Sequence, residues 1–362
     1  MVTIREIAKL AGVSPTTVSR VLNNSRAVQP EICERVLQVA AQMGYTPNAA
    51  ARALVKKGTN AIGVVVNNLH DPFFHDLLLG FEYGALKSDY HVVFCSALGK
   101  SMEEKRKYVR YLSNGVVDGV ILYSVYLFDE EFIRGLYSTG FPILLIENTV
   151  QAVQTHSIAI DNRQGVFNAM KYLYQHGHRQ ISYIAGKQDK AVCVDRLLGY
   201  RRAVEELGLA ARSDYVRYIE EGSEDGWRVM DAFLSMPPDI RPTAVLCYDD
   251  VVASYAIRCA IKRGVRVPDD ISVMGFDNQT IAPSEYTGPP ITSVAQPLYE
   301  IGYDSIVLLS DYLRGDRRER ISRTYPTSIA VKETVAFCGK EGFDKELGGV
   351  PSAVWVGSDS RE

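Results

Sequence analysis

Hydroxyl side chains and one arginine alternate with apolar residues in "SPTTVSRVL", which covers residues 14–22. As a helix, this segment turns Val18 and its apolar neighbours inward and its polar side chains outward. An outward Arg20 can donate two hydrogen bonds to O6 and N7 of guanine, a contact that discriminates between bases by about 1–3 kcal/mol. The hydroxyls and methyls of Thr16 and Thr17 suit neighbouring bases. These residue types therefore predict recognition of base edges in DNA.

Two further helices are expected to hold this segment in place. Thr3 and Glu6 have the spacing of a capping box, which begins a helix, and Gly12 ends that helix. Ser14 and Pro15 suit the N-cap and the first position of a second helix after a short turn. A third helix in "PEICERVLQVAAQMG" can pack its apolar side chains against the first two. Two helices joined by a tight turn and braced by a third form a helix-turn-helix, whose second helix fits the major groove.

We expect the DNA-facing residues of this unit to be Thr3, Ser14, Pro15, Thr16, Thr17, Ser19, Arg20, Asn23 and Asn24. Ser19 and the two asparagines suit phosphates, which position a protein without reading sequence. Residues 1–60 carry eight Lys or Arg against three Glu, a net charge of +5, which leaves −8 for the rest of a chain with net charge −3. This asymmetry indicates a polyanion-binding module. The alternatives are a solvated charged face and a helical hairpin in another assembly.

Further characteristic segments follow in this order along the chain: "GYTPNAAARALVKKGTNAIGVVV", "DPFFHDLLLGFE", "AIDNRQG", "GHRQISYIAG", "RPTAVLCYDD" and "VPDDISVMGFDN". Together with the N-terminal run, they resemble the lactose- and galactose-repressor (LacI/GalR) family of bacterial transcription regulators over residues 2 to about 335. The resemblance implies a repressor of carbohydrate-related genes that binds a palindromic operator as a homodimer and is controlled by a small sugar-like effector. Some relatives tetramerise through a C-terminal leucine heptad, which this sequence lacks, so a dimer is expected.

The segment between the helices and the larger domain, residues 47–60, contains the alanine-rich run "AAARALVKK". A helix of this length is marginal alone in water, so it can form or melt according to what it touches. The resemblance implies that this hinge helix lies in the minor groove, with Leu54 wedged between base steps and Arg52, Lys56 and Lys57 at phosphates. An ordinary interdomain linker, the alternative, would be richer in Gly, Ser or Pro.

From residue 61 onward, short β-branched runs alternate with helical patterns in two series, broken near residues 160 and 290. Repeated βαβ units predict parallel sheets covered by helices. With the family resemblance, which implies a periplasmic-binding-protein-like fold, the fold class expected is an N-terminal all-α helix-turn-helix domain followed by an α/β periplasmic-binding-protein-like (type I) domain of two doubly wound parallel-sheet subdomains. The expected boundaries are 1–46 for the headpiece, 47–60 for the hinge, 61–161 plus 291–323 for the N-subdomain, 162–290 plus 324–339 for the C-subdomain, and 340–362 for a frayed tail.

Polar and aromatic side chains follow the expected strands. Ligands of open α/β sheets bind outside the carboxyl ends of the strands. The candidate effector residues are Asp71, Phe73, Phe74, Glu147, Asn148, Lys190, Arg196, Asp249 and Asp277. The resemblance implies that Phe73 and Phe74 form one wall of a cleft and that Arg196 and Asp277 hydrogen-bond the ligand, with Glu147, Asn148 and Asp249 as further contacts. The mixture suits a small polyhydroxylated ligand.

Simpler roles remain open for several of these residues. A strand-end Asp often caps the next helix, as we expect of Asp161 and Asp250, and the two phenylalanines could belong to the core. Asp249 stands where many relatives carry Asn, and Glu221 replaces an aromatic residue often found there. These departures favour an amino sugar, a cation or an unusual sugar. A nucleoside or purine effector and a protein corepressor are the alternatives within the family.

The sequence lacks the motifs that mark other classes of protein. We expect no enzyme and no cofactor, because GxSxG, P-loop and GxGxxG patterns are absent. The six cysteines form no CxxC pair, and we favour a loop role over a metal site for His176 and His178. With no apolar run long enough for a membrane span and no signal core, we expect a cytoplasmic protein. A solute-binding protein would share the large domain but not the first 60 residues.

Overall fold

The computed structural model describes residues 2–22, 28–45, 58–98, 102–123, 130–147, 155–220 and 222–338. Several sequence predictions fall outside these residues and are not tested by the structure. They concern Asn23, Asn24, Arg52, Leu54, Lys56, Lys57, Asn148, Glu221, most of the hinge and the tail.

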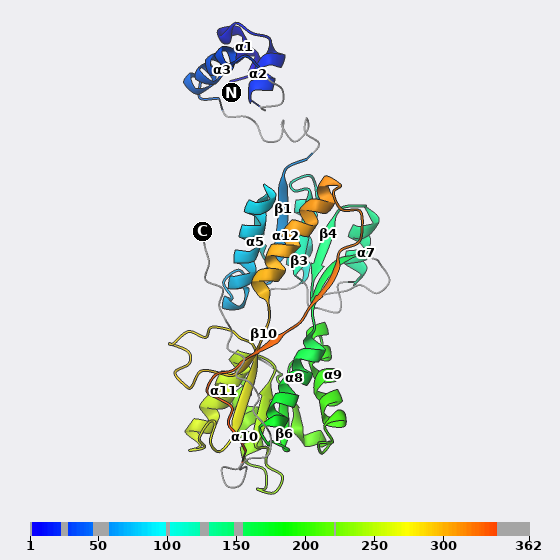
Figure 1. Cartoon of the computed structure of the whole chain (residues 1–362), viewed down its shortest axis with the longest axis vertical. Coiled ribbons are helices and arrows are strands. Elements are labelled where there is room, and N and C mark those ends of the chain that lie inside the picture. Colours follow the sequence, from blue (N-terminus) through cyan, green and yellow to red (C-terminus); the bar gives the residue numbers. More distant parts are fainter. Residues whose placement is uncertain are drawn as a thin grey trace, which may run out of the picture.

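Three helices form the headpiece: α1 (Ile4–Ala11), α2 (Pro15–Leu22) and α3 (Pro30–Gln42) (Figure 1). The expected capping box at Thr3 and Glu6 is present, and Gly12 ends α1 with a left-handed φ of 66°. The Thr17 backbone N–H donates to Ser14 Oγ over 3.1 Å, which caps α2 as expected. Ile7, Val18 and other buried apolar side chains of the three helices form a core of their own. The expected helix-turn-helix arrangement is therefore confirmed.

A parallel six-stranded sheet forms the centre of the N-subdomain, in the order β11-β5-β4-β3-β1-β2. The strands are β1 (Ala61–Val66), β2 (His91–Ser96), β3 (Gly119–Tyr123), β4 (Ile143–Ile146), β5 (His156–Ile160) and β11 (Ser322–Tyr325). Strand β1 is buried along its whole length, as expected of a central parallel strand with both faces covered.

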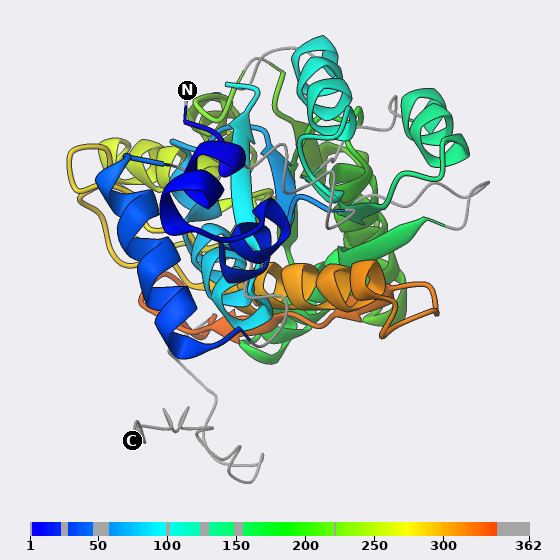
Figure 2. The ribbon, with the colours of Figure 1, turned by 90° about the horizontal axis from the view of Figure 1, so that it is seen from above.

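Helices cover both faces of this sheet (Figures 1 and 2). The residues of α5 (His75–Ser88), preceded by the short 3-10 helix η1 (Pro72–Phe74), and of α12 (Leu298–Arg314) share one core cluster with the sheet. Those of α6 (Met102–Ser113) and α7 (Glu130–Ser138) share another. Alternate residues of β1 enter the two clusters, so the two helix pairs lie on opposite faces.

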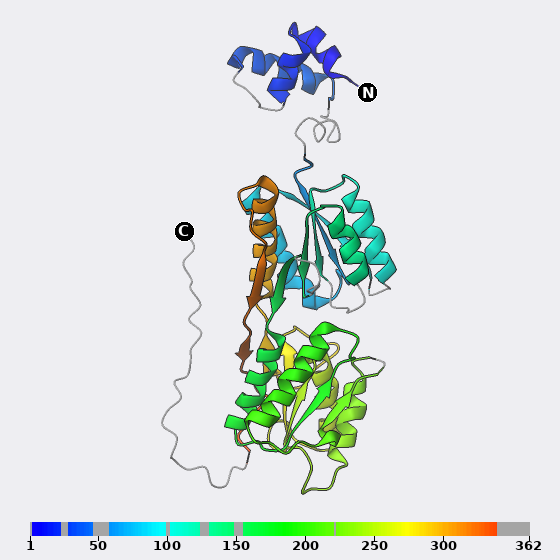
Figure 3. The same ribbon diagram turned by 90° about the vertical axis from the view of Figure 1, so that its right-hand side faces the viewer.

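The C-subdomain repeats this plan with the strand order β12-β10-β9-β8-β6-β7. Its strands are β6 (Ile181–Ala185), β7 (Val216–Tyr218), β8 (Ala244–Cys247), β9 (Ser272–Asp277), β10 (Ser293–Ala295) and β12 (Ser328–Ala330), of which β12 alone among the described strands pairs antiparallel. Its helices are α8 (Asn162–Gln175), α9 (Ala191–Glu206), α10 (Asp225–Leu234), α11 (Asp250–Lys262) and the 3-10 helix η3 (Ser213–Tyr215). Figure 3 shows the two subdomains end to end.

Two expected subdomain boundaries are wrong. Residues 293–295 form β10, which pairs with β9 of the C-subdomain, so the chain does not return to the N-subdomain at residue 291. Residues 322–325 form β11, which pairs with β5 of the N-subdomain, so the last crossing comes after residue 325 and not after residue 323 as expected. Both corrections have the same cause. A strand of three or four residues pairs with the sheet edge that lies beside it in the fold, and the local sequence does not determine which edge that is.

Glycines let α5 and α12 approach closely. A Cβ on Gly80 would lie 2.1 Å from the Tyr299 carbonyl oxygen, and one on Gly302 would lie 2.2 Å from that of Leu77. We expect Gly80→Ala to lower the free energy of unfolding by about 1–3 kcal/mol, because the backbones must separate.

Urea denaturation measures this cost, and Gly135→Ala on α7 is the matched control. A Cβ at Gly135 meets no atom within 4 Å, so alanine there should be neutral or stabilise by up to about 1 kcal/mol. Equal effects of the two substitutions would contradict the close packing of α5 on α12.

Within the described ranges, no helix is long and apolar enough to cross a membrane.

Candidate functional site

The exposed face of α2 carries the predicted base-reading side chains. Arg20 and Thr16 are exposed, Thr17 and Ser19 are half-buried, and Val18 is fully buried in the headpiece core. The hydroxyls of Ser14 and Thr17 form a hydrogen bond of 2.8 Å, and Pro15 occupies the first helical position. Thr3 Oγ1 and the Thr3 backbone N–H both interact with Glu6, so Thr3 caps α1. The structure thus presents Thr16 and Arg20 on one polar surface, and contact with DNA stays a prediction.

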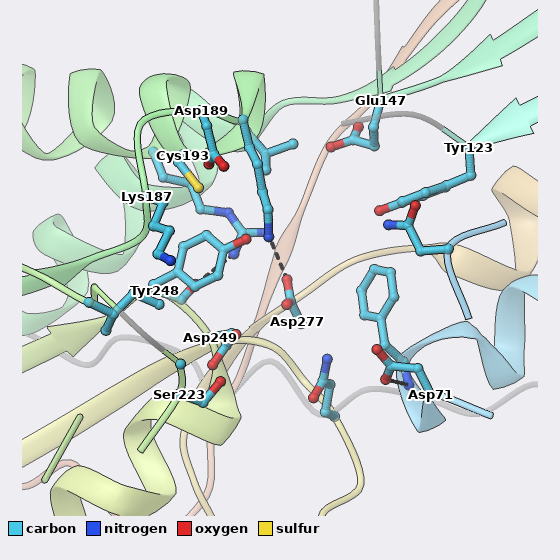
Figure 4. A pocket seen from close by; sticks show the side chains of 18 of the residues that line it. Asp71, Tyr123, Glu147, Lys187, Asp189, Cys193, Ser223, Tyr248, Asp249 and Asp277 are labelled. Atoms are coloured by element: carbon cyan, nitrogen blue, oxygen red, sulfur yellow. Dashed lines mark hydrogen bonds and ion pairs between the residues drawn. The ribbon is translucent and has the colours of Figure 1, made fainter. Parts of the chain in front are cut away.

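A cavity of about 400 Å³ lies between the two subdomains (Figure 4). Its walls contain all the predicted effector residues that the structure describes: Asp71, Phe73, Phe74, Glu147, Lys190, Arg196, Asp249 and Asp277. They come from η1 and the end of β4 in one subdomain and from α9 and the ends of β8 and β9 in the other. The predicted residues therefore lie together, as expected of side chains at the carboxyl ends of parallel strands, which we call the strand-end rule. Their role in binding stays a prediction.

Other lining residues were not predicted from the sequence. They are Asn67, Tyr123, Lys187, Asp189, Val192, Cys193, Ile219, Gly222, Ser223, Tyr248 and Gln279. Asn67 follows β1 directly, Tyr123 ends β3 and Tyr248 follows β8, so the strand-end rule could have found these three. Lys187 and Asp189 lie in the loop before α9, whose position depends on tertiary packing.

Arg196 lies at the centre of the polar contacts in the cavity. Its Nη2 donates to Asp277 Oδ1 over 2.7 Å, its Nε to Asn162 Oδ1 over 2.9 Å, and its Nη1 to the Tyr248 carbonyl over 2.5 Å. The guanidinium also stacks on the Phe276 ring at 3.6 Å from the centroid. Burial disfavours its charge, but Asp277 beside it holds the Arg196 pKa above its ordinary value. The buried pair is thus fixed in place before any ligand arrives.

Phe73 and Phe74 have different surroundings. Phe74 is buried in the N-subdomain core, which confirms the core reading for this residue, although its edge also reaches the cavity. Phe73 is half-buried and makes an edge-to-face contact with Phe74, with ring centroids 5.0 Å apart. Phe73 therefore presents the more exposed aromatic surface to a ligand.

The expected cap at Asp250 is wrong, because Asp249 takes that role. Asp249 Oδ1 accepts a hydrogen bond from the Val252 N–H over 2.7 Å at the start of α11. Asp250 is buried, and its Oδ2 accepts from the Gln279 N–H over 2.6 Å. The side chain fits because its neighbour Gly275 has no Cβ, which would lie 1.9 Å from Asp250 Oδ1. The expected cap at Asp161 is confirmed, since it accepts from the Gln164 N–H over 2.9 Å.

His178 has a structural role. Its ring nitrogens lie 3.0 Å from Thr243 Oγ1 and 3.0 Å from the Ala336 carbonyl, and burial lowers its pKa to about 4. His176 contacts the Tyr172 carbonyl over 2.8 Å. Among the described residues no His, Cys, Asp or Glu group could hold a metal ion. The loop role expected for this pair agrees with these contacts.

Two carboxyl groups of the cavity have raised pKa values. Burial raises the pKa of Glu147 to about 7, against the hydrogen bonds that its oxygens accept from the Ile160 N–H over 2.6 Å and from Asn162 Nδ2 over 2.8 Å. Burial, together with the charge of Asp277, raises the pKa of Asp249 to about 6. Near neutral pH the charge in the cavity therefore depends on pH.

Stability should reflect the raised pKa of Glu147. A carboxyl with a higher pKa in the folded state contributes stability below its unfolded pKa, here 4.5, and loses it as pH rises through about 7. We expect the free energy of unfolding of the wild type, relative to Glu147→Gln, to fall by about 2–3 kcal/mol between pH 5 and pH 8. Urea titrations at both pH values measure it. Parallel pH profiles of the two proteins would show that Glu147 does not titrate in this range.

Two side-chain oxygen atoms in the cavity wall accept no hydrogen bond. Asn67 Oδ1 and Asp189 Oδ1 are buried, and neither accepts a hydrogen bond. Asn67 belongs to the N-subdomain and Asp189 to the C-subdomain, so a bound molecule with donor groups could join the two. A buried acceptor without a partner costs free energy, which such a ligand would recover.

Comparisons with known proteins agree with this architecture. Residues 3–48 match the family described as bacterial regulatory proteins, lacI family, and residues 170–335 match the periplasmic binding protein-like domain. The HTH-type transcriptional repressor PurR of Vibrio campbellii (strain ATCC BAA-1116) is 33% identical over 92% of this chain and 99% of its own length. This chain belongs to the LacI family. The resemblance seen in the sequence is thus confirmed, and the chain is a DNA-binding transcriptional regulator.

Solved structures of LacI-family regulators align over nearly the whole of this LacI-family chain. The transcriptional regulator CelR in complex with cellobiose has a TM-score of 0.68 and 31% identity, covering 92% of this chain and 100% of that one. The lac repressor dimer bound to operator and the anti-inducer ONPF has a TM-score of 0.80 and 26% identity, covering 92% and 99%. The expected fold class, a helix-turn-helix followed by two parallel-sheet subdomains, is confirmed.

Proposed function

We propose that this regulator is a repressor of carbohydrate-related genes, whose affinity for a palindromic operator is set by a sugar-class effector in the cavity between the subdomains. The helix α2 reads base edges in the major groove. The effector favours one relative orientation of the subdomains, and only a difference in affinity for the two orientations can change DNA binding.

The unpaired hydrogen-bond acceptors of the cavity are the main support for a sugar as the effector. Asn67 Oδ1 and Asp189 Oδ1 need donors, and Asp71 and Asp249 add carboxylates to the same walls. A sugar offers a donor on every hydroxyl, so one small ligand can supply donors to several of these oxygens at once. The exposed surface of Phe73 suits the apolar face of a pyranose ring. The CelR complex, which contains cellobiose, is a relative whose ligand is of this class.

The acidic walls also accommodate an amino sugar. One oxygen of Asp249 accepts a hydrogen bond from the Val252 N–H, and its pKa of about 6 leaves Asp249 mostly ionised at neutral pH. An ammonium group near this carboxylate would favour the ionised form further. Amino sugars therefore belong with neutral sugars among the effectors to be tested.

Apolar side chains on α5 and α12 support a homodimer. Tyr83 and Leu86 of α5 are 53% and 78% exposed, and Tyr83 lies 6.2 Å from the Tyr299 ring of α12. An exposed apolar patch of this kind favours association with a second protein surface. In a homodimer the two headpieces would face the two half-sites of a palindrome.

A thermal-shift screen of the full-length chain tests the effector class, with neutral sugars, amino sugars, sugar phosphates and nucleosides as ligands. A ligand that binds the folded state raises the melting temperature. At 100 times its Kd it raises the free energy of unfolding by about 2.7 kcal/mol. We expect the largest shift from a neutral or amino sugar. A shift from nucleosides alone would contradict the proposed class, as would no shift from any sugar for a protein that binds DNA.

A further inference from the structure

A groove of about 420 Å³ lies between α6 and α7, apart from the cavity already described. Its lining consists of Arg106 and Arg110 from α6 and Glu131, Phe132, Gly135 and Leu136 from α7. The volume falls within the range of about 300–1,000 Å³ typical of small-molecule sites. Because α6 and α7 cover the sheet face opposite α5 and α12, a homodimer formed through α5 would leave this groove open (Figure 2).

Two neighbouring arginines without acidic partners line this groove. Arg106 and Arg110 are four residues apart on α6, so they share one helix face, and neither forms an ion pair within the described part of the chain. Like charges at this spacing repel each other. Other arginines of the described residues, such as Arg163, Arg202 and Arg266, pair with a carboxylate, so acidic partners for Arg106 and Arg110 would have been possible in principle.

Both guanidinium groups lie near the same aromatic ring. The Cζ atoms of Arg106 and Arg110 lie 5.4 Å and 6.0 Å from the centroid of Phe132. Arg106 Nε is buried and has no hydrogen-bond partner. A buried donor of this kind needs an acceptor, and the planar guanidinium presents its N–H groups in a fork that suits phosphate oxygens.

We propose that this groove is a second ligand site that binds a phosphate monoester of a small hydroxylated molecule. A phosphate monoester, with a charge of about −1.5 to −2 at neutral pH and three acceptor oxygens, can accept hydrogen bonds from both guanidiniums, whereas the two oxygens of a carboxylate suit one guanidinium fork. Glu131, which also lines the groove, can accept hydrogen bonds from the hydroxyls of the organic part. The groove is also much larger than a phosphate ion needs, which accounts for an organic part.

Isothermal titration of the full-length chain with glucose 6-phosphate tests this site, with glucose as the uncharged probe. We expect Arg106→Gln/Arg110→Gln to weaken glucose 6-phosphate binding by at least about tenfold, because each charge-assisted hydrogen bond lost is worth that much or more. Glucose binding, if present, should be unchanged by these substitutions.

The matched control is Arg201→Gln/Arg258→Gln, which removes the same charge from exposed sites on α9 and α11. It should leave the affinity for glucose 6-phosphate unchanged. Equal weakening by both double variants would show an effect of net charge alone and overturn the proposal. Unchanged affinity in Arg106→Gln/Arg110→Gln, or no binding of glucose 6-phosphate to the wild type at millimolar concentration, would also overturn it. Neither double variant changes a residue that lines the interdomain cavity.

Discussion

Replacing Arg196 with Met is expected to abolish effector binding and to lower the free energy of unfolding by about 3–5 kcal/mol. The side chains of Arg196 and Asp277 are only 4% and 9% exposed, so the substitution leaves a buried carboxylate without its cation. Three of the five guanidinium N–H groups are used within the protein, which leaves donors for a ligand oxygen in the cavity. Chemical denaturation measures the stability loss, and calorimetry with the effector measures binding.

Arg202→Met on the same helix is the control for this experiment. Arg202 pairs with Glu206 at the surface, where both side chains are nearly half exposed, so its loss should cost no more than about 1 kcal/mol. Both variants should keep DNA binding at temperatures where they are folded, because the headpiece has a core of its own. A variant lacking Arg196 that binds the effector normally would remove this residue from the site.

Arg20→Ala should erase the preference for guanine at one position of each half-site, at a cost of about 1–3 kcal/mol. Arg20 is exposed on α2 while Val18, two residues away, is fully buried, so the guanidinium can enter the groove without disturbing the core. Fluorescence anisotropy with operator variants substituted at single positions measures this preference.

Arg35→Ala, at an exposed position on α3, is the matched control and should leave the order of preference among operators unchanged. If Arg20→Ala instead weakened binding to every duplex by the same factor and reduced the salt dependence, Arg20 would be a phosphate contact.

Continuous apolar runs made the central strands predictable from the sequence. "AIGVVV" and "ILLI" coincide with β1 and β4, because a parallel strand buried on both faces shows no alternation of polar residues. The strands β10 and β11 were missed, since three or four residues such as "SRTY" carry no periodic signal. Their pairing depends on the sheet edge that the chain passes, which is a property of the tertiary fold.

The candidate site was predictable as far as strand ends determine it. Glu147, Asp249 and Asp277 follow or end buried strands, and the carboxyl ends of these strands meet at the cavity. The roles within "DD" at residues 249 and 250 were not predictable, because either carboxylate can cap a helix. The space left by Gly275, distant in sequence, admits Asp250 to the interior and leaves Asp249 as the cap.

Coupling between the cavity and the headpiece is the central claim, and one titration tests it most directly. An operator is first selected from random duplex DNA with the purified full-length chain, and its Kd is then measured with and without the sugar that gives the largest thermal shift. The expected result is a change in operator Kd of about 5–150-fold, equivalent to about 1–3 kcal/mol of coupling. The same operator Kd with and without a saturating sugar would contradict the proposed regulation by a sugar bound in the cavity.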